Sequence, residues 1–193
     1  MELVFATNNH HKIVEVQHLM KNNFHLLSLL DIGCNEELPE TGNTLEANAK
    51  QKAQYVHEKY KADCFADDTG LQIEALNGEP GVLSARYAGE EKNSEKNIKK
   101  VLFGMKKNKN RNASFICIIS LIINIKEYIF EGKIDGIILT KKRGQDGFGY
   151  DSIFQPNGFA KSFAEMTLEE KNTISHRAIA VKKLAEFLNS FKK

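Results

Sequence analysis

The segment Phe65-Ala66-Asp67-Asp68-Thr69-Gly70 places two adjacent carboxylates at the end of a short apolar run. The run 62–66 predicts a buried strand, and Thr69-Gly70 predicts a turn directly after it. Side chains alternate between the two faces of a strand, so one aspartate can face a cleft while the other faces its supporting structure. Two like charges this close need a nearby cation, and Mg²⁺ suits such oxygen ligands. The alternative is a turn in which both aspartates are solvated.

The rest of the chain has the composition of a globular protein. Its 193 residues are long enough for one domain with a buried core, and a net charge of +2 argues against nucleic-acid binding through charge alone. The longest apolar run, 115–125, is shorter than the ~20 residues of a membrane helix, and the N-terminus lacks a signal-peptide pattern. Cys64 and Cys117 lie in apolar runs, which favours buried reduced thiols and a cytoplasmic protein.

Alternating helix and strand patterns predict an α/β fold with a mixed sheet flanked by helices. We expect strands at 3–6, 24–29, 62–66 and 71–75, a hairpin of 113–123 with 128–139, and helices at 12–21, 43–60 and 93–105. Capping-box patterns begin the second helix at Asn43 and a short helix at Thr167, and Ser175 is placed to cap the last helix.

The first predicted strand is followed by Thr7-Asn8-Asn9-His10-His11-Lys12. A helix that begins after a strand presents backbone N–H groups to an anion, and Lys12 adds a positive charge. The segment lacks the glycines and the Gly-Lys-Ser/Thr ending of a Walker loop. It therefore indicates either a phosphate site or an ordinary strand-to-helix junction.

Glu40 and Lys52 are candidates to act beside Asp68. Glu40 lies in a polar loop before the second helix, where it can supply a third acid for a metal site, and Lys52 lies on that helix. The alternatives are an exposed loop glutamate and a surface lysine.

The segment Gly144–Asp151 contains three glycines within six residues, which permits a tight loop whose backbone approaches a ligand. Phe148 and Tyr150 are poorly placed for core packing in such a loop, and a ring there can stack on a nucleobase. The alternative is a turn whose two rings cover the sheet edge.

His176 and Arg177 follow the candidate cap Ser175, so they fall in the first turn of the last helix, where cations oppose the helix dipole. That placement indicates an anionic or carbonyl-bearing ligand, or else a solvated first turn.

Together these residues resemble the Ham1/RdgB family of inosine triphosphate pyrophosphatases. The similar segments are Thr7–Lys12, Glu40-Thr41-Gly42, 48–53, 67–70, Pro80-Gly81, 84–87, 147–151 and 171–177. The resemblance implies an ITPase/Maf-like fold: one two-lobed domain over 1–193, with a long curved mixed sheet and an active-site cleft between the lobes. It also implies a homodimer. The implied activity is Mg²⁺-dependent hydrolysis of ITP, dITP and XTP to the monophosphate and pyrophosphate, which removes deaminated purines from the nucleotide pool.

The resemblance also implies roles for single residues. Asp68 is expected to be the catalytic base or water-orienting acid and, with Glu40, a metal ligand, while Asp67 supports the pair. Phe148 is expected to stack on the base, and Asp151, Lys171, His176 and Arg177 to line its pocket. The full set expected to bind substrate is Thr7, Asn8, Asn9, His10, His11, Lys12, Lys52, Thr69, Phe148, Gly149, Tyr150, Asp151, Lys171, His176 and Arg177.

Two positions depart from the family pattern. Asn8 stands where the family has glycine, and Asn tolerates a left-handed backbone better than most residues. Thr69 stands where serine is frequent and keeps the hydroxyl. Both substitutions could shift nucleotide affinity.

Three other readings compete with this one. A nucleotide sensor without catalysis conflicts with the intact set of acids and lysines. A nucleic-acid-binding protein that uses 106–111 conflicts with the near-neutral charge. A Maf-like pyrophosphatase is disfavoured by the segments 147–151 and 175–177. We therefore expect neither a nucleic-acid nor a membrane partner.

Overall fold

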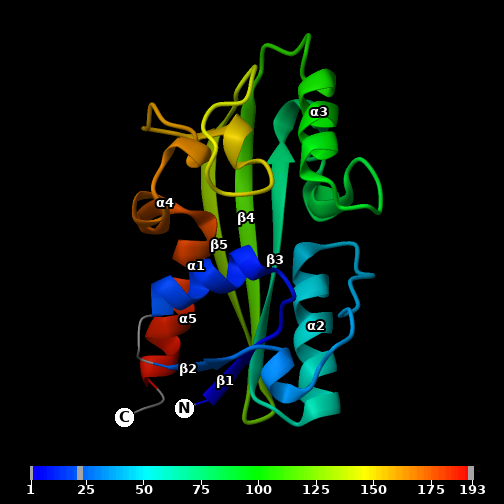
Figure 1. Cartoon of the computed structure of the whole chain (residues 1–193), viewed down its shortest axis with the longest axis vertical. Coiled ribbons are helices and arrows are strands. Elements are labelled where there is room, and N and C mark those ends of the chain that lie inside the picture. The colour runs from blue at the N-terminus through cyan, green and yellow to red at the C-terminus, as the bar shows by residue number, and fades with distance from the viewer. Residues whose placement is uncertain (1, 21–23, 191–193) are drawn as a thin grey trace. The chain divides into compact units, whose positions relative to one another are not determined.

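The structure, a computed structural model, describes residues 2–20 and 24–190 (Figure 1). The chain divides into two compact units. Unit 1 comprises Met1–Asp68, Cys117–Gly132 and Arg177–Lys193, and unit 2 comprises Thr69–Ile116 and Lys133–His176. The boundary falls directly after the aspartate pair. The single two-lobed domain and its cleft stay predictions.

A mixed six-stranded sheet forms in the described part of the chain. Its order is β2-β1-β3-β4-β5-β6, in which β1 pairs in parallel with β2 and β3, and β5 pairs antiparallel with β6. The strands are β1 (Glu2–Phe5), β2 (His25–Leu27), β3 (Cys64–Ile73), β4 (Asn112–Ile123), β5 (Lys126–Ile138) and β6 (Phe154–Pro156). The helices are α1 (His10–Met20), α2 (Leu45–Tyr60), α3 (Ser94–Gly104), α4 (Leu168–Ile174) and α5 (His176–Ser190). The predicted mixed α/β fold is confirmed.

Unit 1 is a three-layer arrangement because its strands are apolar on both faces. Leu3 and Phe5 of β1 and Phe65 of β3 pack in one core with residues of α1 and α5. Val4 of β1 and Ala66 of β3 point the other way, into a second core with residues of α2. In unit 1, strand alternation thus directs the odd positions of β1 and of the first part of β3 toward α1 and α5, and the even positions toward α2. Figure 1 shows α1 and α5 on one side of these strands and α2 on the other.

Unit 2 has a core of its own, built around aromatic side chains. Leu71 and Ile73 of β3 pack with residues of α3, with the first half of β4 and with the segment that follows β5. Phe115 of β4 lies against Phe154, with ring centroids 4.7 Å apart, and stacks on His176 at the same distance. These contacts hold the start of α5 against β4.

The predicted turn at Thr69-Gly70 is wrong, because β3 runs unbroken from Cys64 to Ile73. Gly70 is not among the described residues with positive φ, so it continues the strand. Leu71 and Ile73 are fully buried in the unit 2 core. Their burial favours the extended chain over the turn that a Thr-Gly pair suggests in isolation.

Three other details differ from expectation. The cap of α2 is Thr44, not Asn43: its hydroxyl accepts a hydrogen bond from the Ala47 N–H, 3.0 Å away. The helix α1 begins at His10 because Asn9 caps it, its Oδ1 accepting from the Lys12 N–H at 3.3 Å. The short strand β6 was not expected, since three residues give too little pattern.

Other predicted features are confirmed. Thr167 and Glu170 form a capping box at α4. Asn124 and Ile125 connect β4 to β5 with positive φ at both residues, the geometry of a tight hairpin. All three cysteines are buried thiols. Within residues 2–20 and 24–190, none of the helices has the length and apolar character to cross a membrane.

Candidate active site

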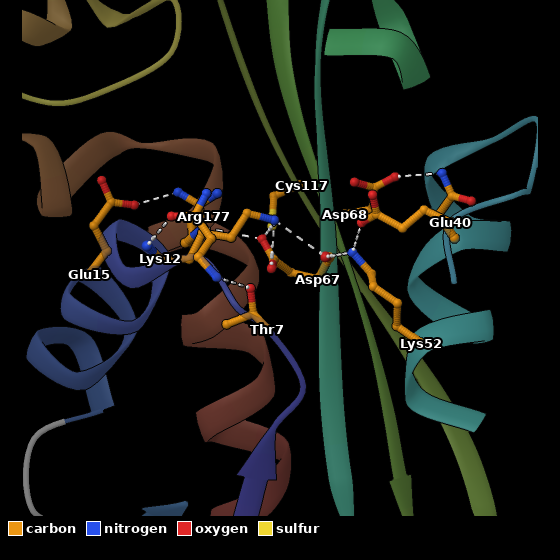
Figure 2. Close-up of polar contacts among 11 residues, drawn as sticks. Thr7, Lys12, Glu15, Glu40, Lys52, Asp67, Asp68, Cys117 and Arg177 are labelled. Carbon is orange, nitrogen blue, oxygen red and sulfur yellow. Dashed lines mark hydrogen bonds and ion pairs between the residues drawn. The ribbon is translucent and has the colours of Figure 1, made fainter. Parts of the chain in front are cut away.

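The strand β3 directs the two aspartates to opposite faces. Asp67 follows Phe65 on the α1/α5 face, and Asp68 follows Ala66 on the α2 face. Figure 2 shows the Asp67 side chain turned toward Lys12 and Arg177, and the Asp68 side chain on the side of Glu40 and Lys52. Both carboxyl groups are buried. The opposite directions of the two side chains, expected from strand alternation, are therefore confirmed, and the roles of the two acids stay predictions.

Asp67 lies among cations. Lys12 Nζ is 2.9 Å from Asp67 Oδ1, and Arg177 Nε donates to Oδ2 at 3.3 Å. The Cys117 thiol lies 3.7 Å from Oδ2, and Lys52 Nζ donates to the Asp67 backbone carbonyl at 2.7 Å. Asp67 therefore connects α1, α2, β4 and α5 in unit 1.

The charges around Asp67 keep it ionised. Burial acts to raise its pKa, but the positive charges of Lys12, Arg177 and Lys52 outweigh burial and hold the pKa below the ordinary value of 3.8. A carboxylate that stays charged and accepts this many hydrogen bonds is suited to structural support. It is poorly suited to proton transfer near neutral pH.

Arg177 is only 1% exposed, so the solvated first turn that the sequence left open is wrong. Its Nη1 pairs with the buried carboxylate of Glu15 on α1, and its Nε pairs with Asp67. Burial acts to lower the pKa of Arg177, but the charges of Asp67 and Glu15 raise it overall. The cation that looked misplaced against the helix dipole is thus compensated by two acids.

The other face of β3 carries Asp68 with a second set of partners. Asn48 of α2 donates from Nδ2 to Asp68 Oδ2 at 3.1 Å. Lys52, four residues further along the same helix, donates to Glu40 Oε1 at 2.5 Å. Lys52 is therefore buried rather than on the surface, and Glu40 is half-buried in an ion pair rather than an isolated loop residue.

The surroundings of Asp68 shift its pKa in the direction opposite to that of Asp67. Burial raises the pKa of Asp68, and the negative charge of Glu40 adds to this, against the opposing charges of Lys52 and Lys12. Burial acts to lower the pKa of Lys52, but Asp68, Glu40 and Asp67 raise it overall, so Lys52 remains a cation. A raised carboxyl pKa is typical of a group that exchanges protons during catalysis.

The α2 face of the site suits a magnesium ion. Two carboxylates, Asp68 and Glu40, face one ammonium, Lys52, which leaves a formal charge of −1. The described residues contain no cluster of three or more His, Cys, Asp or Glu side chains able to hold a metal by themselves. Mg²⁺ is commonly bound by one or two carboxylates together with substrate phosphates, and the donor set fits that pattern.

The segment 7–12 presents the start of α1. Thr7 is buried, and its Oγ1 accepts from the Asn9 N–H at 3.2 Å, while His10 and His11 are exposed on the first turn. Asn8 donates from Nδ2 to the Glu36 carbonyl at 3.2 Å, and its φ is not positive. The loop therefore does not use the left-handed conformation that Gly allows, and Asn at position 8 imposes no backbone strain.

In unit 2, the loop 144–151 closes on Asp151. Asp151 Oδ2 accepts from the Phe148 N–H at 2.9 Å and from Lys171 Nζ at 2.7 Å. Lys171 Nζ also lies 5.0 Å from the centroid of the Phe148 ring. Gly147 adopts φ +74°, and a Cβ there would lie 2.2 Å from Asp151 Oδ2, so only glycine fits.

The expectation that both rings of this loop avoid the core is wrong for Tyr150. Its ring is buried in the unit 2 core, and its hydroxyl donates to the Ser84 carbonyl at 2.8 Å. Phe148 is half-buried beside Lys171, and its stacking on a base stays a prediction. Gly149 keeps a positive φ of 60°, and Thr69 is half-buried in β3.

The structure thus brings the predicted residues together in two groups. Unit 1 gathers Lys12, Glu40, Lys52, Asp67, Asp68 and Arg177, and unit 2 gathers Phe148, Asp151 and Lys171. Sequence reasoning missed Glu15 and Asn48. A glutamate between Val14 and Val16, and an asparagine inside a helix that disfavours it, are the signals that could have identified them.

The fold and this site define an α/β protein in which paired carboxylates are surrounded by buried cations. A family model described as the Ham1 family matches residues 3–187, and the chain belongs to that family.

Individual relatives cover the chain almost completely. The dITP/XTP pyrophosphatase of Flavobacterium johnsoniae is 53% identical over 192 residues, covering 100% of both chains, and that of Porphyromonas gingivalis is 50% identical over 188 residues, covering 97% of each. Among solved structures, the Staphylococcus aureus Ham1 protein matches with a TM-score of 0.90 at 38% identity and covers 98% of this chain and 99% of its own. A Ham1 protein from Coxiella burnetii gives 0.91 at 36%, with the same coverage.

Proposed function

We propose that this protein hydrolyses the purine nucleoside triphosphates dITP, XTP and ITP between the α- and β-phosphates, releasing the monophosphate and pyrophosphate. The observation that carries the proposal is Asp68: a buried carboxylate with a raised pKa, beside Glu40 and the ammonium of Lys52. Relatives at about half identity over the full chain are named dITP/XTP pyrophosphatases, which supports the substrate class.

Different side chains of the site have different functions in the proposed reaction. Asp68 orients the attacking water and accepts its proton, for which a raised pKa is favourable. Lys12 and Lys52 supply fixed positive charge to the phosphates, since phosphoryl transfer depends on positioning and charge stabilisation. Asp67 holds Lys12 and Arg177 in place and stays ionised near neutral pH, and Glu15 pairs with Arg177 as well.

Asp68 and Glu40 would hold Mg²⁺ together with the substrate. When bound, the ion supplies charge neutralisation at the phosphate oxygens and lowers the pKa of a bound water.

Base recognition is assigned to unit 2. The half-buried Phe148 ring offers a stacking surface, and Asp151 and Lys171 offer a fixed charge pair beside it. Hypoxanthine and xanthine carry a carbonyl at position six, whereas adenine carries an amino group. A donor that pairs with the carbonyl is left unpaired by adenine, at a cost of about 1–3 kcal/mol for each buried group.

A substrate panel assayed for pyrophosphate tests the proposal. With Mg²⁺, the purified protein should release pyrophosphate from dITP, XTP and ITP and little from ATP. Removal of Mg²⁺ by a chelator should stop turnover, and Asp68→Asn should bind nucleotide without turning it over. Cleavage of ATP as fast as ITP, or no cleavage of any purine triphosphate, would overturn the proposal.

A further inference from the structure

Asn48 contacts Asp68 and the loop that carries Glu40. It is 1% exposed, on the second turn of α2. Its Oδ1 accepts a hydrogen bond from the backbone N–H of Gly42 at 2.8 Å, and its Nδ2 donates to Asp68 Oδ2 at 3.1 Å. Gly42 is two residues after Glu40 in the loop before the helix. One buried amide therefore joins that loop to the carboxylate of Asp68.

The backbone determines which way the amide faces. The Gly42 N–H can only donate, so the oxygen of Asn48 must face it and the NH₂ group must face Asp68. Asn48 can therefore give Asp68 a donor but no acceptor. Such a contact favours the ionised carboxylate and fixes the orientation of Oδ2.

Close packing limits the freedom of this amide. A Cβ at Gly42 would lie 2.7 Å from the Ala47 Cβ and 2.9 Å from Asn48 Oδ1, so the loop lies directly against the helix. Lys52 is one turn further along α2, on the same helix face, and holds Glu40. The same face of α2 thus contacts both acids.

We propose that Asn48 is a positioning residue for the reaction: its NH₂ group fixes the Asp68 carboxylate relative to Glu40. This inference rests on the proposed function. Asn48 acts through the N–H group that it donates to Asp68, and not through the volume of its side chain. A positioning role and a packing role therefore predict different effects of substitution. Its loss affects turnover more than nucleotide binding.

The test compares Asn48→Asp with Asn48→Ala. Asp has the shape of Asn and keeps an acceptor for the Gly42 N–H, but it replaces the donor by a second carboxylate facing Asp68. Ala removes both contacts without adding a charge. We expect kcat to fall about 10–100-fold in Asn48→Ala and further in Asn48→Asp, as for other supporting residues. The KM and the Kd for a non-hydrolysable α,β-methylene dITP should stay close to wild type.

A packing role predicts the reverse order, because Ala leaves a cavity and Asp does not. Gln54→Glu makes the same amide-to-acid change on an exposed position of α2 and is the control for charge on that helix. The proposal is overturned if Asn48→Asp keeps a kcat above that of Asn48→Ala, or if both variants lose nucleotide affinity in proportion to kcat.

Two further measurements keep the outcome clear. Circular dichroism shows whether the Asn48 variants fold. If one does not, Gly42→Ala is tested instead, because its added methyl group displaces the Asn48 amide, and it should lower kcat with KM unchanged. A wild-type kcat in Gly42→Ala would then count against the proposal. If wild-type protein releases no pyrophosphate from dITP, the proposed function fails. An active wild type with fully active Asn48 variants contradicts this inference alone.

Discussion

The buried carboxylate of Asp67 pairs with Lys12 and Arg177. The next residue, Asp68, faces α2 instead, where Lys52 is paired with Glu40. The chemical type is the same at both positions. The difference in behaviour arises from the neighbours, which lower the pKa of Asp67 and raise that of Asp68. Residue identity alone could not predict this division, because Lys12, Arg177 and Glu15 are distant in sequence.

Asp67→Asn should destabilise the fold, because it removes the carboxylate that pairs with Lys12 and one of the two acids that compensate the buried Arg177. Breaking one partner of a buried ion pair costs about 3–5 kcal/mol. Urea denaturation at pH 7 measures the change, with the exposed Glu58→Gln as a control expected within about 0.5 kcal/mol of wild type.

The same prediction has a pH dependence. Because folding lowers the pKa of Asp67, its contribution to stability is present above the ordinary value of 3.8 and is lost as the pH falls. Asp67→Asn should therefore lose less stability than wild type on acidification. An Asp67→Asn variant as stable as the control would contradict the assigned role.

The role of Asp68 as a base predicts how kcat/KM changes at low pH. A base must be ionised, and the pKa of Asp68 is raised, so kcat/KM should fall with decreasing pH around a value above 3.8. Initial rates with dITP across buffers of constant ionic strength measure this limb. A midpoint at or below 3.8 would assign the limb to another group.

At the scale of elements, the course of β3 decides where the acids lie. The sequence predicted its first half, and strand alternation predicted that the two side chains face opposite sides. Which aspartate takes which role was implied only by the family resemblance. The sequence did not predict that the strand continues through Thr69-Gly70, because the burial of Leu71 and Ile73 that favours extension depends on α3 and β4. The capping box at Thr167, which depends only on neighbouring residues, was predicted correctly, whereas the cap of α2 lies one residue after the predicted Asn43.

The loop 144–151 offers a matched pair of glycine substitutions. Gly147→Ala adds backbone strain and a contact with Asp151, whereas Gly149→Ala adds strain at φ +60° with no heavy atom within 4 Å. Gly147→Ala should displace Asp151 from Lys171 and lower kcat/KM for dITP roughly tenfold more than Gly149→Ala, or about 1.4 kcal/mol. Equal losses in the two variants would indicate that strain alone matters.

At the scale of the whole molecule, the hydrophobic pattern predicted the mixed sheet and the order of its main elements. The family resemblance implied roles for the site residues, and the structure gave their contacts. Periodicity identifies strands and helices because burial repeats with their geometry. It carries no information about which distant side chains meet, so Glu15 and Asn48 gained their roles only from the structure.

Quaternary structure gives a prediction at this scale. The family resemblance implies a homodimer, and large apolar side chains such as Phe103 and Ile125 are well exposed on the described surface. Sedimentation equilibrium should give twice the 21.8 kDa mass of one chain. A single-chain mass at all micromolar concentrations would contradict the expectation.

The alternation of β3 also constrains how this protein can evolve. Phe65 and Asp67 share one face of the strand, and Ala66 and Asp68 share the other. An insertion or deletion of one residue within the strand before the pair would exchange the faces, so that each carboxylate met the other's partners. A change of two residues would keep each face. We therefore expect related chains that differ in length before this pair to differ within the preceding loop or by even steps within the strand.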